Sequence, residues 1–265
     1  MNNSEHLKQL PKKKFQIMNI IWLLIFIVGF ILSVQSTDTH ISDLFKNWGQ
    51  FCDIFVEMSH PDWNYFSTVV GPLIETLKMA ILGTFLGSII AFIYSFAIAR
   101  NIVKNKIIVS VLRIIMNIIR TVPDLLLGAI FAAIVGIGPL AGVLALTVFT
   151  FGVVVKLFYE AIETIDEGPI EAMKAVGANK FQIIQEAVMP QVLTYFISYV
   201  LYAFEINVRA STVLGYVGAG GIGVLLQISL GRFNYAQTGL IILVIFVVVF
   251  LIDYVSSKFR EAVMK

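Results

Sequence analysis

Apolar residues occur in long runs that short polar segments separate. Phe15–Val34 and Met79–Ala99 contain no charged residue over 20 and 21 positions, and a helix of that length crosses the ~30 Å hydrocarbon core of a bilayer. Four further runs, less pure in composition, have a similar length: Ile107–Val135, Pro139–Phe158, Gln191–Thr212 and Tyr235–Tyr254. The pattern predicts an all-α polytopic membrane protein with about six transmembrane helices.

Positively charged residues gather at alternate ends of these runs. Lysines occupy positions 12–14 before the first run, and three more bases follow the second, whereas residues 35–71 between them carry five acidic residues and one lysine. Because Lys and Arg accumulate on the cytosolic side, both termini are expected inside. This topology divides the chain into a cytosolic tail (1–14), a first transmembrane anchor (15–34), an external segment (35–71), a membrane core with five helices (72–258) and a second cytosolic tail (259–265).

Within the external segment, apolar residues recur every three or four positions between Ile41 and Met58, with polar residues between them. This spacing predicts an amphipathic helix at the outer membrane interface, ended by His60–Pro61. The helix has two possible roles, as a packing element of the membrane core or as a docking site.

One polar segment, Glu163–Pro190, lies between two apolar runs on the cytosolic side. Acidic residues and Pro169 at its start favour the first turn of a helix. Gly177 then predicts a break and a turn into a second short helix over Lys180–Val188. A compact two-helix projection of this kind offers a partner something to bind.

The same segment resembles the EAA loop of ABC importer permeases. The match rests on Glu171, Ala172, Gly177 and Pro190, which keep the spacing of that motif. Three positions of the motif carry other residues here: Met173, Ala187 and Met189. Further segments resemble the phosphonate-type branch of these permeases: Pro61–Trp63, Glu75–Thr84, Arg120–Leu126 and Phe204–Gly223.

The resemblance implies the permease fold of type I ABC importers and a non-catalytic subunit that forms a translocation path. It implies that the EAA loop docks on a cytosolic ABC ATPase, present in two copies. It further implies a second permease, identical or homologous, and an external substrate-binding protein. The implied substrate is a phosphonate or a related phosphorus oxyanion, and the residues do not distinguish phosphonate from phosphite or phosphate.

Polar side chains interrupt the third and fifth predicted spans: Arg113, Asn117, Arg120, Asp124, Glu205 and Arg209. Such residues are costly in a bilayer and are expected to face protein or water. The first four follow a 4-3-4 spacing, which places them on one helical face, and the last two can pair across one turn. Two interpretations remain open. The stripe lines a path in which arginine contacts an oxyanion, or Arg120–Asp124 and Arg209–Glu205 pairs clamp helices together.

A glycine run matches the dinucleotide-binding pattern G-x-G-x-x-G at Gly218, Gly220 and Gly223. That pattern requires a preceding strand in a βαβ unit, whereas here it follows a membrane span. We expect these glycines, with Gly221, to provide close backbone packing near the outer mouth.

Composition narrows the function classes further. The chain is 58% hydrophobic and 14% charged, with a net charge of +2, three His and one Cys. These values predict a protein of the lipid bilayer with no nucleic-acid partner, no metal cluster and no cofactor. No Gly is followed by Lys, so the sequence has no P-loop, and ATP hydrolysis is expected on a separate chain. The alternative is a secondary transporter that uses Asp124 and Glu205 as a proton relay.

Overall fold

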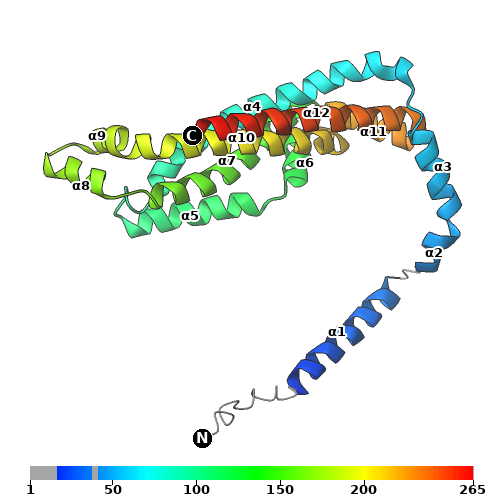
Figure 1. Ribbon diagram of the computed structural model, residues 1–265, viewed down its shortest axis with the longest axis horizontal. Helices are drawn as coiled ribbons and strands as arrows, with labels where there is room; N and C mark the ends of the chain where they lie inside the picture. The colour runs from blue at the N-terminus through cyan, green and yellow to red at the C-terminus, as the bar shows by residue number, and fades with distance from the viewer. Residues whose placement is uncertain (1–16, 38–40, 265) are drawn as a thin grey trace, which may run out of the picture. The chain divides into compact units, whose positions relative to one another are not determined.

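The computed structural model describes residues 17–37 and 41–264 (Figure 1), and every regular element in these two stretches is a helix. The chain divides into two compact units, Met1–Phe55 and Val56–Lys265. The all-α prediction is confirmed. The predicted tail over 1–14 and the first residues of the predicted span Phe15–Val34 lie outside the described residues.

The first unit contains α1 (Ile17–Ser36), α2 (Ile41–Lys46) and most of α3 (Trp48–Met58). The apolar window of α1 is not buried anywhere within the chain, as expected of a helix that faces lipid or a partner on all sides. The predicted amphipathic helix over Ile41–Met58 is not continuous, because the chain interrupts it between Lys46 and Trp48.

The second unit holds the remaining elements: η1 (Trp63–Tyr65), α4 (Phe66–Ile98), α5 (Lys106–Thr121), α6 (Asp124–Val135), α7 (Pro139–Glu163), α8 (Gly168–Ala175), α9 (Lys180–Gln182), the π-helix η2 (Ile183–Val188), α10 (Met189–Leu214), η3 (Gly215–Val217), α11 (Ile222–Gly231) and α12 (Tyr235–Val263). Four helical stretches are long and apolar enough to cross a membrane: η1 with α4, α7, α9 through η3 (which includes α10), and α12. With α1 they make five spans among the described residues, and six if the bent α5–α6 pair counts as one.

Helices α4 and α7 pack closely because glycine lines their contact. A Cβ atom at Gly83 would lie 2.5 Å from Cβ of Leu146, and one at Gly87 would lie 2.5 Å from the carbonyl oxygen of Thr147. Gly83 and Gly87 form a G-x-x-x-G pair, the spacing that lets membrane helices approach until their backbones touch.

A buried amide joins α10 to this pair. Asn207 Nδ2 donates to Thr84 Oγ1 at 2.7 Å and to Thr150 Oγ1 at 2.6 Å, and all three side chains are buried. Hydrogen bonds between polar side chains stabilise helix contacts where lipid offers no competing partner. The three helices therefore form one core.

The third predicted span, Ile107–Val135, is broken. Its two parts, α5 and α6, meet at an angle of 87°. Val122 is extended (φ −78°, ψ 120°), as the residue before proline prefers. Pro123 then precedes α6 and lacks the N–H that would continue α5. The expectation that Asp124 continues the helical face of Arg113, Asn117 and Arg120 is therefore wrong.

Candidate functional site

Residues 163–190 form a projection that we call the knob, at the end of the second unit where α7 finishes and α10 begins (Figure 1). Its first helix, α8, starts with Pro169 in the first turn, where a missing N–H costs nothing. Asp166 Oδ1 accepts a hydrogen bond from the Gly168 amide at 3.0 Å. The predicted helix-start chemistry therefore operates at this position.

Gly177 turns the chain between the two short helices. Its φ of +81° lies in the left-handed region that glycine adopts without strain. Asn179 and Gln182 then form a reciprocal capping box at the start of α9. The following residues adopt a π-turn, in which the Met189 amide donates to the Ile184 carbonyl, just before Pro190 removes a donor at the start of α10.

The base of the knob is apolar and fixed. Ile170, Ala187 and Val188 are at most 4% exposed and pack with Phe158 and Ile162 of α7. A side chain of α10 ties the two ends together: Gln191 Oε1 accepts from the Asp166 amide at 3.1 Å, and its Nε2 donates to the Asp166 carbonyl at 3.3 Å. The knob is therefore continuous with the helices on both sides.

The apex of the knob is exposed. Glu171, Ala172 and Gly177 all lie at the surface, and next to the corner Val176 is 79% and Phe181 73% exposed. Two large apolar side chains exposed on a polar loop are a candidate contact surface for a partner. The sequence prediction missed Val176 and Phe181, although their positions beside Gly177 are a local signal.

Arg113 lies in an interhelical clamp. Its guanidinium donates to the Ile98 carbonyl at 3.1 and 2.8 Å and to Glu163 Oε1 at 2.5 Å, and it stacks over the Tyr159 ring at 4.3 Å. Glu163 also accepts from the Arg100 amide at 2.6 Å. One arginine thus joins α5 to the ends of α4 and α7, beside the start of the knob.

The bend between α5 and α6 separates the last member of the predicted stripe from the other three. Asn117 and Arg120 are exposed on α5, whereas Asp124 belongs to α6 beyond the 87° bend. Asp124 accepts from the neighbouring Leu125 amide at 2.9 Å, and no ion pair joins it to Arg120 within the part of the chain that the structure describes. The Arg120–Asp124 pair that the clamp interpretation requires is therefore not formed.

A second ionic cluster connects α10 and α12. Glu205 binds Arg209 at 2.6 Å, as their spacing predicts, and it also binds Arg260 at 2.9 Å. Arg209 further approaches Asp253 at 3.9 Å. The sequence prediction missed Arg260 because it assigned residues 259–265 to a cytosolic tail, whereas α12 continues to Val263.

Arg209 and Asp124 also line an open hollow of about 490 Å³, together with Tyr202 and apolar residues of α6 and α10. Arg209 is 49% exposed, whereas the carboxylate of Glu205 behind it is 12% exposed. The outer face of the Arg209 guanidinium is therefore available to this hollow.

The glycine run adopts the conformations and contacts of close packing. Gly218, Gly220 and Gly221 have φ values of +85°, +79° and +74°. The Gly221 amide donates to Glu75 Oε1 at 3.1 Å, and the Ile222 amide donates to Thr76 Oγ1 at 2.8 Å. A Cβ atom at Gly223 would collide with the Thr212 carbonyl. The amides at the start of α11 therefore bind the protein's own side chains.

Known proteins share this fold and sequence pattern. A family model described as the binding-protein-dependent transport system inner membrane component matches residues 83–261. The phosphite transport system permease protein PtxC of Stutzerimonas stutzeri is 43% identical over 205 residues, covering 77% of this chain and 74% of that protein. The phosphate-import permease protein PhnE of Mycolicibacterium smegmatis is 34% identical over 209 residues, covering 78% of this chain and 39% of that protein. A chain of the inward-facing MetNI methionine ABC transporter has a TM-score of 0.68 and 25% identity, and the match covers 77% of this chain and 100% of that chain.

The matched region contains the knob and both ionic clusters. The predicted permease fold of ABC importers is confirmed, and the apolar helices place the chain in the bacterial cytoplasmic membrane as a multi-pass protein. Its family works with a cytosolic ATPase and a binding protein. This chain belongs to the family of binding-protein-dependent transport system inner membrane components.

Proposed function

We propose that this chain is the permease subunit of an ATP-driven importer for phosphite, phosphonate or phosphate. Two permease subunits, identical or homologous, form the path, and two cytosolic ATPases bind the two knobs. An external binding protein delivers the substrate. The observation that carries this proposal is the knob itself, with an exposed apolar apex on a base that is continuous with α7 and α10.

The apex supports coupling to an ATPase. Val176 and Phe181 provide apolar area for a cleft in the partner, and Ala172 and Gly177 let the partner approach the backbone closely. Apart from Gly177 and its two neighbours in the sequence, no residue has an atom within 4 Å of a Cβ built at Gly177. The space beside this glycine is therefore open to a partner. ATP hydrolysis belongs to that separate chain.

The substrate class rests on the names of the relatives and on the Arg209 hollow. The relatives are a phosphite and a phosphate permease, and the tetrahedral oxyanions of both compounds accept bidentate hydrogen bonds from arginine. However, Glu205, Arg209, Asp253 and Arg260 together have no net charge. We therefore assign selectivity mainly to the binding protein, and to Arg209 a transient contact during passage.

The proton-relay alternative is less well supported. A relay needs a carboxyl that gains and loses a proton during transport. In Glu205, one carboxylate oxygen binds Arg209 and the other binds Arg260, so both oxygens are held in ion pairs within the protein.

Uptake of radiolabelled phosphite into vesicles tests coupling. The assay contains the chain, its ATPase, its binding protein and ATP. Gly177→Trp should abolish uptake and release the ATPase in a pull-down, because the bulky ring occupies the partner's space. Gly177→Ala is the matched control. It adds only backbone strain of about 1–2 kcal/mol and should keep most of the uptake. Uptake by the chain alone under an ion gradient, without ATP, would sink the proposal.

A second variant tests the contact in the path. Arg209→Gln should lower the maximal rate of phosphite uptake about tenfold or more while leaving ATPase binding unchanged, since one charge-assisted hydrogen bond contributes about 1.5–3 kcal/mol. Lys258→Gln, on the exposed face of α12, is the control for loss of one positive charge. Normal phosphite uptake by Arg209→Gln would show that Arg209 makes no contact needed for passage of the substrate.

A further inference from the structure

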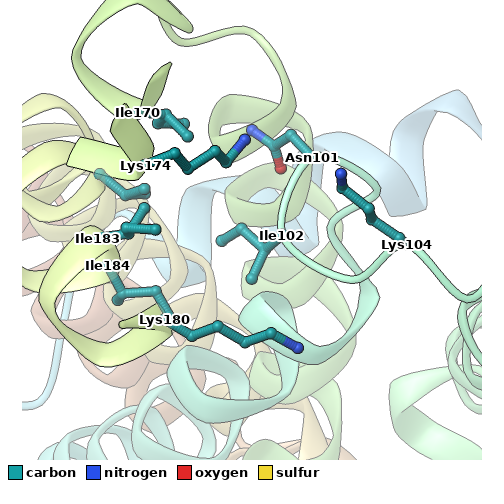
Figure 2. A pocket seen from close by; sticks show the side chains of 9 residues that line it. Asn101, Ile102, Lys104, Ile170, Lys174, Lys180, Ile183 and Ile184 are labelled. Carbon is teal, nitrogen blue, oxygen red and sulfur yellow. The ribbon is translucent and has the colours of Figure 1, made fainter. Parts of the chain in front are cut away.

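A basic pocket lies between the knob and the loop that joins α4 to α5. It has a volume of about 380 Å³ and nine lining residues: Asn101, Ile102, Lys104, Ile170, Lys174, Lys180, Ile183, Ile184 and Val188. Figure 2 shows Lys174 and Lys180 extending from the knob towards the loop, on either side of Ile102, with Lys104 opposite. The pocket is separate from the exposed apex at Val176 and Phe181.

The charges around this pocket are not neutralised by the protein. Three lysines and no acidic residue line it, which gives a formal charge of +3. None of the three side-chain ammonium groups makes a hydrogen bond or an ion pair within residues 17–37 and 41–264, whereas those of Lys156 and Lys258 elsewhere both pair with glutamates. Like charges that line one cavity repel each other, and an anion bound among them offsets this repulsion.

The remaining lining is aliphatic and rigid. Four isoleucines and Val188 line the pocket, and Ile170 and Val188 belong to the buried base of the knob. Asn101 fixes the opposite wall, because its Nδ2 donates to the Ile162 carbonyl of α7 at 2.6 Å. The pocket therefore suits a ligand with an anionic group attached to an apolar body.

The position of the pocket selects among such ligands. It lies where α4 ends at Ile98, where α7 ends at Glu163 and where α10 begins at Met189. These ends mark the cytosolic boundary of the membrane core in the predicted topology. Basic pockets between membrane helices on this side bind the headgroups of anionic lipids. An acidic segment of the ATPase would pair with the lysines but would leave the aliphatic lining without an apolar partner.

We propose that this pocket binds the phosphate headgroup of an anionic phospholipid, which bridges Lys174 and Lys180 of the knob to Lys104 of the α4–α5 loop. The bound lipid fixes the knob against the ends of α4 and α7. The inference concerns lipid binding alone and does not depend on which substrate is transported.

Thermal unfolding of the full-length chain in detergent tests the site. Added phosphatidylglycerol should raise the midpoint of wild type more than phosphatidylcholine does, because a ligand that binds the folded state stabilises it. In Lys174→Gln/Lys180→Gln the half-saturating concentration should rise roughly 30-fold, from about fivefold per lysine near an anionic lipid. Lys106→Gln/Lys258→Gln, with the same charge change outside the pocket, should keep the wild-type value. Lys174→Arg/Lys180→Arg should also keep it.

Three results would overturn the proposal. The first is a wild-type lipid response in the Lys174→Gln/Lys180→Gln variant, and the second is an equal loss in the control variant. The third is an equal shift by inorganic phosphate that prevents the response to phosphatidylglycerol, because the site would then bind free phosphate. Loss of ATPase binding in the Gln variant with an unchanged lipid response would assign the lysines to the ATPase.

Discussion

The Glu205 cluster gives the sharpest test of what holds α10 to α12. Its carboxylate binds Arg209 on its own helix at 2.6 Å and Arg260 on α12 at 2.9 Å. Glu205→Gln keeps the size of the side chain and removes the charge. Both arginines then lose their shared anion, although Arg209 keeps Asp253 at 3.9 Å and Arg260 keeps a hydrogen bond to Ser257.

The two halves of the cluster should contribute unequally. Arg209 is 49% exposed, so its pair with Glu205 resembles surface pairs, which are worth about 0.2–1 kcal/mol. Arg260 is 25% exposed against a carboxylate that is 12% exposed, so its hydrogen bond approaches the about 1.5–3 kcal/mol of charge-assisted bonds. We expect Glu205→Gln to lower the stability by about 2–3 kcal/mol, with most of the loss at Arg260.

A double-mutant cycle on the apparent unfolding temperature in detergent measures this difference. Glu205→Gln, Arg260→Gln and Arg209→Gln are compared singly and in pairs, so that the coupling energy isolates each contact. The Glu205–Arg260 coupling should be about two or more times the Glu205–Arg209 coupling. Additive effects of Glu205→Gln and Arg260→Gln would show that the bridge between α10 and α12 contributes nothing, and the reasoning would fail.

Two further changes test the helix contacts. Gly87→Ala should lower the apparent unfolding temperature, at a cost of about 1–3 kcal/mol, because its methyl group would meet the Thr147 carbonyl at 2.5 Å. The control is Gly71→Ala, whose methyl group has no atom within 4 Å. Equal effects of the two substitutions would contradict the close contact. Thr76→Val should lower the free energy of unfolding by about 1–3 kcal/mol, because it leaves the buried Ile222 amide without an acceptor. Thr76→Ser keeps the hydroxyl and should retain most of the stability. Equal losses in both variants would show that the hydroxyl is not the cause.

The membrane spans were predictable because apolar length is a local property, but the bend between α5 and α6 was not. The spacing of Arg113, Asn117, Arg120 and Asp124 assumes one straight helix. Pro123 and the extended Val122 place the last residue on a different axis. Proline was visible in the sequence, yet membrane helices often tolerate it: α4 continues through Pro72.

The second failure of the sequence prediction concerned ion pairs between residues far apart in the sequence. Arg113 binds a carboxylate 50 residues away, and Glu205 binds an arginine 55 residues away. Helical spacing identifies only neighbours at three or four positions, which is why it found Arg209 and missed Arg260. The G-x-x-x-G pair at Gly83 and Gly87 was a local signal for the α4–α7 contact, and the sequence prediction did not use it.

The knob was predictable because its determinants lie within 163–190. One helix, α10, connects the knob to the hollow that Arg209 lines. Pro190 and Arg209 lie 19 positions apart on α10, about 29 Å at 1.5 Å per residue. Asn207 fixes this helix to Thr84 and Thr150 two positions before Arg209. A displacement of the knob by an ATPase therefore cannot be absorbed by a loop before it reaches the Asn207 junction. The same displacement reaches α7 through the packed base of the knob, where Ile170 and Val188 lie in one cluster with Phe158 and Ile162. In the proposed mechanism, α10 and α7, joined near Arg209 by the Asn207–Thr150 hydrogen bond, carry the movement of the apex to the proposed path.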